Sequence, residues 1–439
     1  MKIIKQHQFL SVILFLSFIA AGLYSPLSYA QTYKQVQENR PDQIINTSIK
    51  TVLLYREGLE LSDPVVFLNE QTKLVCEFDD LDADYKDYKY TVIHCDPWWK
   101  PTDGLERNDY ISSYFTDEYI RDSESSYNTI TPFIHYSFTF PAEGTEFIMS
   151  GNYLLKVYEE SEDEPIFTRG FMVAEQTVGI TGKVAKSTNP AIRPMVQQVM
   201  FNIDLNGFYM SDPYRNLEVV VSQNERWDNA IRDVKPRIVL NNKLQYNEEG
   251  MFVFNGYNEF RFLDLKGLHY LASKVSRIEV MEGEYTVYVD DTKPARFHAY
   301  KYKEDINGKF LIYTENGDNA GTESEYVQVK LYLPWDRPIA GGELFVTGAF
   351  CNWQFLEENR AIYSPKKGGY LIDLYLKQGY YNYTYAVVEL GNLPADAAYI
   401  DGTFADAQNL YSINAYYREP GEYHYRLIGR QIIDSAESF

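Results

Sequence analysis

The string His94-Cys95-Asp96 is the part of the chain that most invites a catalytic interpretation, because a histidine can activate a cysteine nucleophile. The residues before it alternate, with Tyr90, Val92 and His94 on one face of an expected β-strand. Neighbouring side chains of a strand point to opposite faces, so His94 and Cys95 cannot form a dyad. We therefore expect His94 to be a structural histidine with hydrogen-bonded ring nitrogens.

The acidic run at residues 79–84 is a second feature with chemical potential, since clustered carboxylates can bind calcium. It lacks the central glycine and closing glutamate of an EF-hand loop, so we expect a solvated turn between strands. Nucleophile-elbow, P-loop and zinc-protease motifs are missing from the sequence, as is any zinc-ligand spacing. With 62 acidic residues, no carboxylate pair can be singled out for a glycosidase. These observations predict a protein that is not an enzyme and has no cofactor and no metal site.

The three cysteines are Cys76, Cys95 and Cys351. A disulfide between Cys76 and Cys95 requires that their strands be neighbours, which the sequence leaves open. Cys351 has no evident partner.

The N-terminus predicts export. Lys2 and Lys5 precede an uncharged apolar run, and residues 28–30 form a small-x-small cleavage site, so residues 1–30 are expected to be a signal peptide. Residues 31–48 are polar and are expected to be a flexible leader. Removing the two signal lysines from 41 basic residues leaves 39 against 62 acidic ones, a net charge of −23. This balance disfavours nucleic acid and anionic membrane surfaces as partners.

The elements that position these residues are expected to be β-strands throughout. Aromatic residues make up 16% of the chain, which favours pleated, half-buried surfaces. Short alternating runs between turn signals predict an all-β protein of tandem immunoglobulin-like β-sandwiches, arranged as an elongated body. The expected domains are residues 49–175, 176–304 and 305–433, followed by a tail at 434–439 that carries an O-glycosylation-like sequence around Ser435.

Aromatic side chains near residue 100 are the candidates for partner contact. Trp98 and Trp99 are adjacent in a segment framed by prolines, so one ring is expected to pack inward and the other to be partly exposed. The alternative is that both fold under the long polar insert at residues 100–127. That insert carries Tyr110, Tyr114 and Phe115, and we predict that these five aromatic residues contribute to a binding surface.

The first domain resembles the N-terminal domain of the plug proteins of the type IX secretion system, an export machine of Bacteroidota. The resemblance extends from about residue 49 to 173 and is carried by residues 90–96 with Trp99, and by residues 126–129, 135–141 and 150–158. It implies a periplasmic protein at the inner side of the outer membrane, attached through protein contacts and monomeric when free. Such a protein would block the periplasmic opening of the translocon barrel while no substrate occupies it.

The third domain resembles early-set, immunoglobulin-like modules that include glycogen- and starch-binding domains. Residues 346–353 (VTGAFCNW) and 379–383 (GYYNY) carry this resemblance, although Cys351 stands where the pattern has asparagine. It implies an alternative function, a glycan-binding exported protein, with Trp353 stacking on a sugar. Packing of Trp353 inside its module is favoured, because a large ring gains most from burial.

Overall fold

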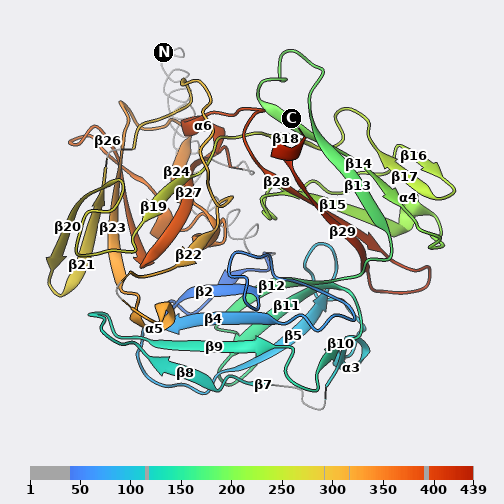
Figure 1. Cartoon of the computed structure of the whole chain (residues 1–439), viewed down its shortest axis with the longest axis horizontal. Coiled ribbons are helices and arrows are strands. Elements are labelled where there is room, and N and C mark those ends of the chain that lie inside the picture. The colour runs from blue at the N-terminus through green and yellow to red at the C-terminus, as the bar shows by residue number, and fades with distance from the viewer. Residues whose placement is uncertain (1–39, 114–117, 291, 316, 390–394, 439) are drawn as a thin grey trace, which may run out of the picture.

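The structure, a computed structural model, describes residues 40–113, 118–290, 292–315, 317–389 and 395–438. The described residues form β-sheets with a few short helices, which confirms the all-β sandwich prediction. Figure 1 shows three lobes around a common centre instead of the elongated row that we expected. The expected signal peptide at residues 1–30 lies outside the described residues.

The first sandwich packs two sheets around a core rich in aromatic rings, among them Phe78, Tyr136 and Tyr153. One sheet has the order β1-β12-β11-β5-β7 with β3 beside β12, and the other has the order β2-β4-β9-β8. Helix α3 and strand β6 lie in the insert, and β6 pairs with β10, which follows β9. The bounds are β1 Gln43–Ile44, β2 Ile49–Arg56, β3 Val65–Phe67, β4 Leu74–Asp80, β5 Lys89–Cys95, α3 Arg107–Tyr110, β6 Ile111–Ser112, β7 Glu118–Tyr119, β8 Asp122–Ser125, β9 Ile134–Phe140, β10 Glu146–Phe147, β11 Gly151–Tyr158 and β12 Phe167–Ala174.

The end of the expected leader is part of this sandwich. Strand β1 pairs with β12, and the Asp42 carboxylate accepts a hydrogen bond from the Gly170 amide at 2.9 Å. The prediction of a flexible leader is therefore wrong for residues 40–48, because an edge strand satisfies its backbone groups on β12.

The second sandwich is assembled from two stretches that lie far apart in the sequence. One sheet has the order β13-β14-β17-β16 with β18 beside β14, and the other has the order β15-β28-β29. The bounds are β13 Gly179–Lys186, β14 Val196–Asp204, α4 Pro213–Asn216, β15 Leu217–Gln223, β16 Ile238–Leu240, β17 Lys243–Tyr246, β18 Val253–Asn255, β28 Leu410–Tyr417 and β29 Arg426–Asp434.

The third sandwich is consequently an insertion between β18 and β28. Its sheets have the orders β19-β27-β22, with β24 beside β27, and β20-β21-β23-β26-β25. The expected boundaries at residues 304 and 433 do not coincide with these sheets, because alternation locates strands but does not reveal their partners. The bounds are β19 Arg261–Asp264, β20 Val275–Met281, β21 Glu284–Val289, β22 Phe310–Ile312, α5 Ala320–Glu323, β23 Tyr326–Pro334, β24 Gly342–Thr347, η1 Ala349–Cys351, η2 Glu357–Asn359, β25 Ile362–Ser364, β26 Gly369–Lys377, β27 Gly379–Glu389, α6 Ala398–Asp401 and, after β29, η3 Ser435–Glu437.

The C-terminal serine considered for glycosylation is buried. Ser435 is 0% exposed, and its hydroxyl accepts from the Asn409 amide and donates to the Ala407 carbonyl. A glycan cannot be attached to this hydroxyl in the folded protein, so Ser435 acts as a structural residue.

Candidate functional site

Trp98 and Trp99 lie where the first and second sandwiches meet. Trp99 has a φ of 65° and is 7% exposed, and its ring packs edge-on against Trp227 with centroids 4.9 Å apart. Trp98 is half-buried and packs against Tyr425 at 5.9 Å. One ring does point inward, but the surface that receives it belongs to the same chain, so Trp99 offers no surface to a second protein.

The insert places its aromatic candidates differently from expectation. Tyr110 is buried, and its hydroxyl donates to the Val92 carbonyl at 3.2 Å. It therefore supports the core and not a binding surface. Tyr114 and Phe115 lie outside the described residues.

Polar contacts reinforce the contact between the first and second sandwiches. Arg426 donates to both oxygens of the Glu175 carboxylate, and Tyr416 donates to the Asn152 side chain at 2.7 Å. Burial would raise the pKa of Glu175, but hydrogen bonds from Arg426, Ser150 and Thr177 outweigh it and hold this pKa below its usual value.

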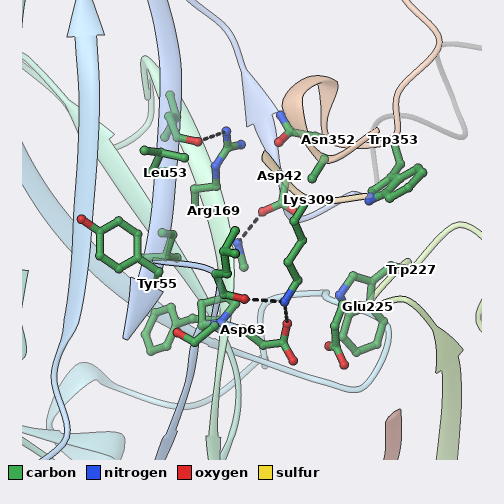
Figure 2. Close-up of a pocket in the computed structure, with 18 of the residues that line it drawn as sticks. Asp42, Leu53, Tyr55, Asp63, Arg169, Glu225, Trp227, Lys309, Asn352 and Trp353 are labelled. Atoms are coloured by element: carbon green, nitrogen blue, oxygen red, sulfur yellow. Dashed lines mark hydrogen bonds and ion pairs between the residues drawn. The ribbon is translucent and has the colours of Figure 1, made fainter. Parts of the chain in front are cut away.

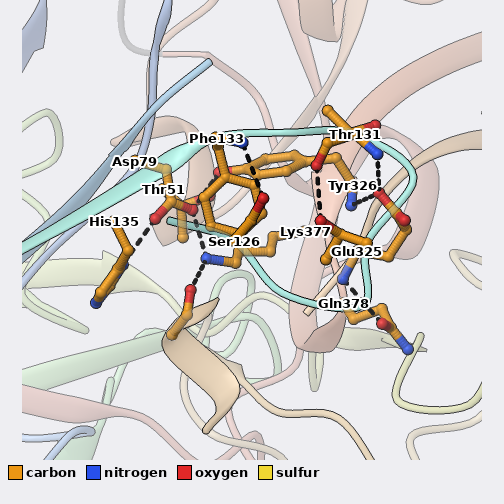
Figure 3. A network of polar contacts seen from close by, with 12 residues as sticks. Thr51, Asp79, Ser126, Thr131, Phe133, His135, Glu325, Tyr326, Lys377 and Gln378 are labelled. Atoms are coloured by element: carbon orange, nitrogen blue, oxygen red, sulfur yellow. Dashed lines mark hydrogen bonds and ion pairs between the residues drawn. The ribbon is translucent and has the colours of Figure 1, made fainter. Parts of the chain in front are cut away.

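A buried ion pair joins the first and third sandwiches (Figure 3). Asp79 at the end of β4 accepts hydrogen bonds from Lys377 of β26, from His135 at 2.7 Å and from the Tyr326 hydroxyl at 2.6 Å. The Asp79 and Lys377 side chains are each 1% exposed. Burial alone would raise the pKa of Asp79, but the charge of Lys377 and the hydrogen bond from His135 hold it below its usual value.

This network overturns the expectation of a solvated acidic turn. Asp79 and Asp80 are 0% exposed, and Asp80 is bound by Lys86 at 2.8 Å and by the Tyr88 hydroxyl at 2.9 Å. The sequence did carry a signal: Asp80 continues the inward face of Leu74, Cys76 and Phe78, a place where a carboxylate needs a buried partner.

The loop before β9 inserts into the third sandwich next to this pair. The Tyr127 amide donates to the Thr322 carbonyl at 3.0 Å. Glu325, which is 4% exposed, accepts from the amides of Ile130 and Thr131 and from the amide of Tyr326. A buried carboxylate thus holds the loop through its backbone, and that contact does not depend on the loop side chains.

All three sandwiches meet at a charged cluster. Asp63 of the first accepts from Lys309 of the third at 2.7 Å, and Figure 2 shows this pair with Glu225 nearby. Arg430 of the second donates to Asp63 at 3.2 Å and to Glu225 at 3.0 Å. Burial raises the pKa of Glu225 to about 7, with Arg430 opposing and Asp63 adding to the rise. A pocket of about 180 Å³ lies beside the cluster and is lined in part by Trp99 and other aromatic side chains.

Trp353, the candidate for sugar stacking, is half-buried at this junction. The Arg226 guanidinium of the second sandwich lies 4.5 Å from the centre of its ring, and Phe260 packs edge-on at 5.8 Å. Its carbonyl accepts from Arg40 at 2.6 Å. A guanidinium therefore occupies one face of the indole, which leaves that face unavailable to a sugar ring.

The residues that suggested nucleophilic chemistry are buried and structural. His94 is 1% exposed and hydrogen-bonds through its two ring nitrogens to Thr102 and the Ser150 carbonyl. Burial lowers the pKa of His94 to about 4. Cys76 and Cys95 are buried free thiols, and burial raises the pKa of Cys95 to about 12. Neither thiol is poised to ionise near neutral pH.

Within the described ranges, no group of three or more histidine, cysteine, aspartate and glutamate side chains could hold a metal ion. In the same part of the chain, no helix has the length and apolarity needed to cross a membrane.

Two comparisons with known proteins identify the family of this chain. Residues 49–175 match the family model described as the type 9 secretion system plug protein first domain. A hypothetical protein from Parabacteroides merdae ATCC 43184 has a crystal structure similar to this one, with a TM-score of 0.85 and 30% identity over 90% of this chain and 98% of that chain. The chain belongs to the type 9 secretion system plug family. No curated protein matches the sequence.

A second solved structure is too dissimilar to inform the function of this plug-family chain. The C-terminal domain of the Streptococcus pyogenes antigen I/II-family protein AspA is 7% identical, with a TM-score of 0.15 over 89% of this chain and 99% of that one.

The segments that carry the plug-family resemblance take part in the interdomain contacts. Residues 126–129 begin the loop held by the third sandwich, and Trp99 packs on the second. Asn152 belongs to residues 150–158, another of these segments, and its side chain accepts a hydrogen bond from the Tyr416 hydroxyl of the second sandwich. The sequence analysis did not identify the residues that pair with the first sandwich, such as Lys377 with Asp79 and Arg430 with Asp63. The sequence around Lys377 and Arg430 gives no local sign that they bind carboxylates of another sandwich.

Proposed function

We propose that this plug-family protein is a non-enzymatic, periplasmic barrier that closes the periplasmic opening of the outer-membrane type IX translocon while no substrate occupies the channel. The observation that carries the proposal is the match of the first sandwich to the plug family over residues 49–175. The proposed mechanism is steric: a folded body fills an opening and is displaced when cargo enters. It requires no catalytic residue.

The arrangement of the sandwiches supports this mechanism. A barrier must keep its shape while it is seated, and here all three sandwiches are tied together by buried and half-buried charges. The pair Asp79–Lys377 joins the first to the third, and the cluster of Asp63, Lys309 and Arg430 joins all three. Separating these contacts would leave charges without partners in a poorly solvated environment, which opposes hinge motion between the lobes.

We place the translocon contact on the outer surface of the first sandwich, beside the insert. Trp99 and Tyr110 are interior, so the exposed aromatic residues there are the better candidates. Tyr119 is 55% exposed with Lys89 lying 5.2 Å from its ring centre, and Tyr85 is 64% exposed with its hydroxyl on Ser125 of β8. Large rings on a removable interface can supply much of the binding energy.

The decisive experiment is recovery of the translocon with the tagged protein from cell envelopes. Wild-type protein should bring down a large outer-membrane barrel, and the variant Tyr85→Ala/Tyr119→Ala should lose it. Tyr209→Ala, at an 81% exposed position of the second sandwich, is the matched control and should retain it.

A cellular assay tests the barrier role separately. Deleting the gene should raise the permeability of the outer membrane in cells whose translocon carries no substrate, and the wild-type gene should restore it. Unchanged permeability in such cells would refute the barrier role, even if the protein binds the barrel.

A further inference from the structure

The middle of the loop between β21 and β22 reverses the charge balance of the rest of the chain. Residues 292–303 contain four basic residues and no carboxylate, whereas acidic residues outnumber basic ones 62 to 41 in the whole chain. The four are Lys293, Arg296, Lys301 and Lys303, and all are exposed. Among the described residues, none of the four forms an ion pair within 4.0 Å, unlike the exposed pairs of Lys50, Lys186 and Arg277. The middle of the loop therefore presents positive charge, with the exposed carboxylates of Asp290 and Glu304 at its two ends.

Two aromatic rings stand among these charges. Phe297 is 87% exposed and Tyr302 is 60% exposed. Phe297 lies in a turn in which the His298 amide donates to the Ala295 carbonyl at 2.9 Å. The Arg296 guanidinium lies 4.9 Å from the centre of the Phe297 ring, but most of this apolar ring remains in water, so it gains little from the fold.

The turn is anchored, so its ring is presented at a fixed place. The amides of Ala295 and Arg296 both donate to the Ile400 carbonyl of α6, at 3.2 and 3.1 Å. Figure 1 shows α6 on the side of the molecule away from the strands of the first sandwich. The loop is thus remote from the surface that we assign to the translocon.

Other charged groups lie near the loop. Burial, together with the charges of Lys303 and Arg261, lowers the pKa of Lys274 to about 8. Two carboxylates near the base of the loop are turned toward the body: Asp305 accepts from the Phe260 amide, and Glu259 accepts from the Tyr300 hydroxyl and the Gln408 amide. Asp290 and Glu304, by contrast, are exposed.

We infer that this loop is a membrane-contact site that docks on an anionic phospholipid surface, with Phe297 and Tyr302 entering the headgroup layer and the four cations facing phosphates. Lysine is depleted at protein–protein interfaces, whereas lysine, arginine and aromatic rings together are typical of segments at a bilayer surface. The net charge of the chain keeps the other faces away from such a surface, so the docking has one orientation.

The test is sedimentation of the full mature protein with vesicles at low salt. Wild-type protein should sediment with vesicles of phosphatidylglycerol and phosphatidylethanolamine, should not sediment with phosphatidylcholine alone, and should be released by salt. Lys301→Glu/Lys303→Glu should lower the partition coefficient at least about thirtyfold, since each cation near an anionic surface contributes about fivefold. Phe297→Ser should lower it roughly tenfold, and Phe297→Trp should restore it.

Two matched controls distinguish an effect of this loop from the effect of any change in net charge or any loss of an exposed ring. Lys366→Glu/Lys367→Glu changes the net charge by the same amount at an exposed turn of the same sandwich, and Tyr423→Ser removes an 81% exposed ring elsewhere. Both should bind vesicles as the wild type does. The inference is overturned if the wild type fails to sediment with the anionic vesicles, or if the loop variants bind as well as the controls. Either result leaves the barrier role untouched, because that role is measured by permeability.

Discussion

Replacing Lys377 by methionine tests whether the buried pair holds the first and third sandwiches together. Methionine keeps much of the volume of lysine but leaves Asp79 as a charge buried without its cation. Breaking such a pair by removing one partner costs about 3–5 kcal/mol, so the urea midpoint of unfolding should fall by about 1–2 M.

A matched control is available on β26, the strand that carries Lys377. Lys330 and Asp373 form an ion pair between β23 and β26 at 2.8 Å, with side chains 36% and 62% exposed. Because water already screens that pair, Lys330→Met should cost about 0–1 kcal/mol. Urea denaturation measures the loss of unfolding free energy in both variants. Equal losses for the Lys377 and Lys330 variants would refute the argument that burial makes the Asp79–Lys377 pair important.

Two further measurements sharpen the same prediction. Asp79→Asn combined with Lys377→Met removes both charges and should recover most of the loss, since neutral replacement of a buried pair is often close to neutral. The folded pKa of Asp79 lies below its unfolded value, so its contribution is present above about pH 4 and is lost as pH falls through the lowered folded pKa. In wild-type protein, the contact between the first and third sandwiches should therefore weaken in acid, which urea midpoints measured at falling pH would show.

Three other predictions follow from buried groups. Trp99→Ala should lower the free energy of unfolding by about 3–5 kcal/mol, and Trp98→Ala by clearly less, because only Trp99 is enclosed between two sandwiches; urea denaturation compares them. Glu225 binds its proton more tightly in the folded state, so its contribution to stability is present at low pH and is lost as pH rises from 4.5 to about 7; Glu225→Gln should flatten that slope. The reverse holds for His94, whose folded pKa of about 4 makes stability fall as pH drops from 6.5 to about 4; urea midpoints of His94→Gln across this range should lack that fall.

The sequence by itself determined the fold class and the family. Alternation located strands such as residues 326–333 and separated His94 from Cys95, because side-chain direction along a strand depends only on spacing. The motifs of the first domain were sufficient for the resemblance to the plug family, since they lie within one continuous stretch.

The tertiary structure decided which surfaces of the strands meet. Asp79 and Lys377 are 298 residues apart, and β15 pairs with β28, which follows it by almost 190 residues of intervening chain. Trp99 looked available for a partner protein until the second sandwich was seen to cover it. Contacts of this kind depend on how sheets from distant segments pack, and no local pattern of hydrophobicity or charge encodes the identity of the partner.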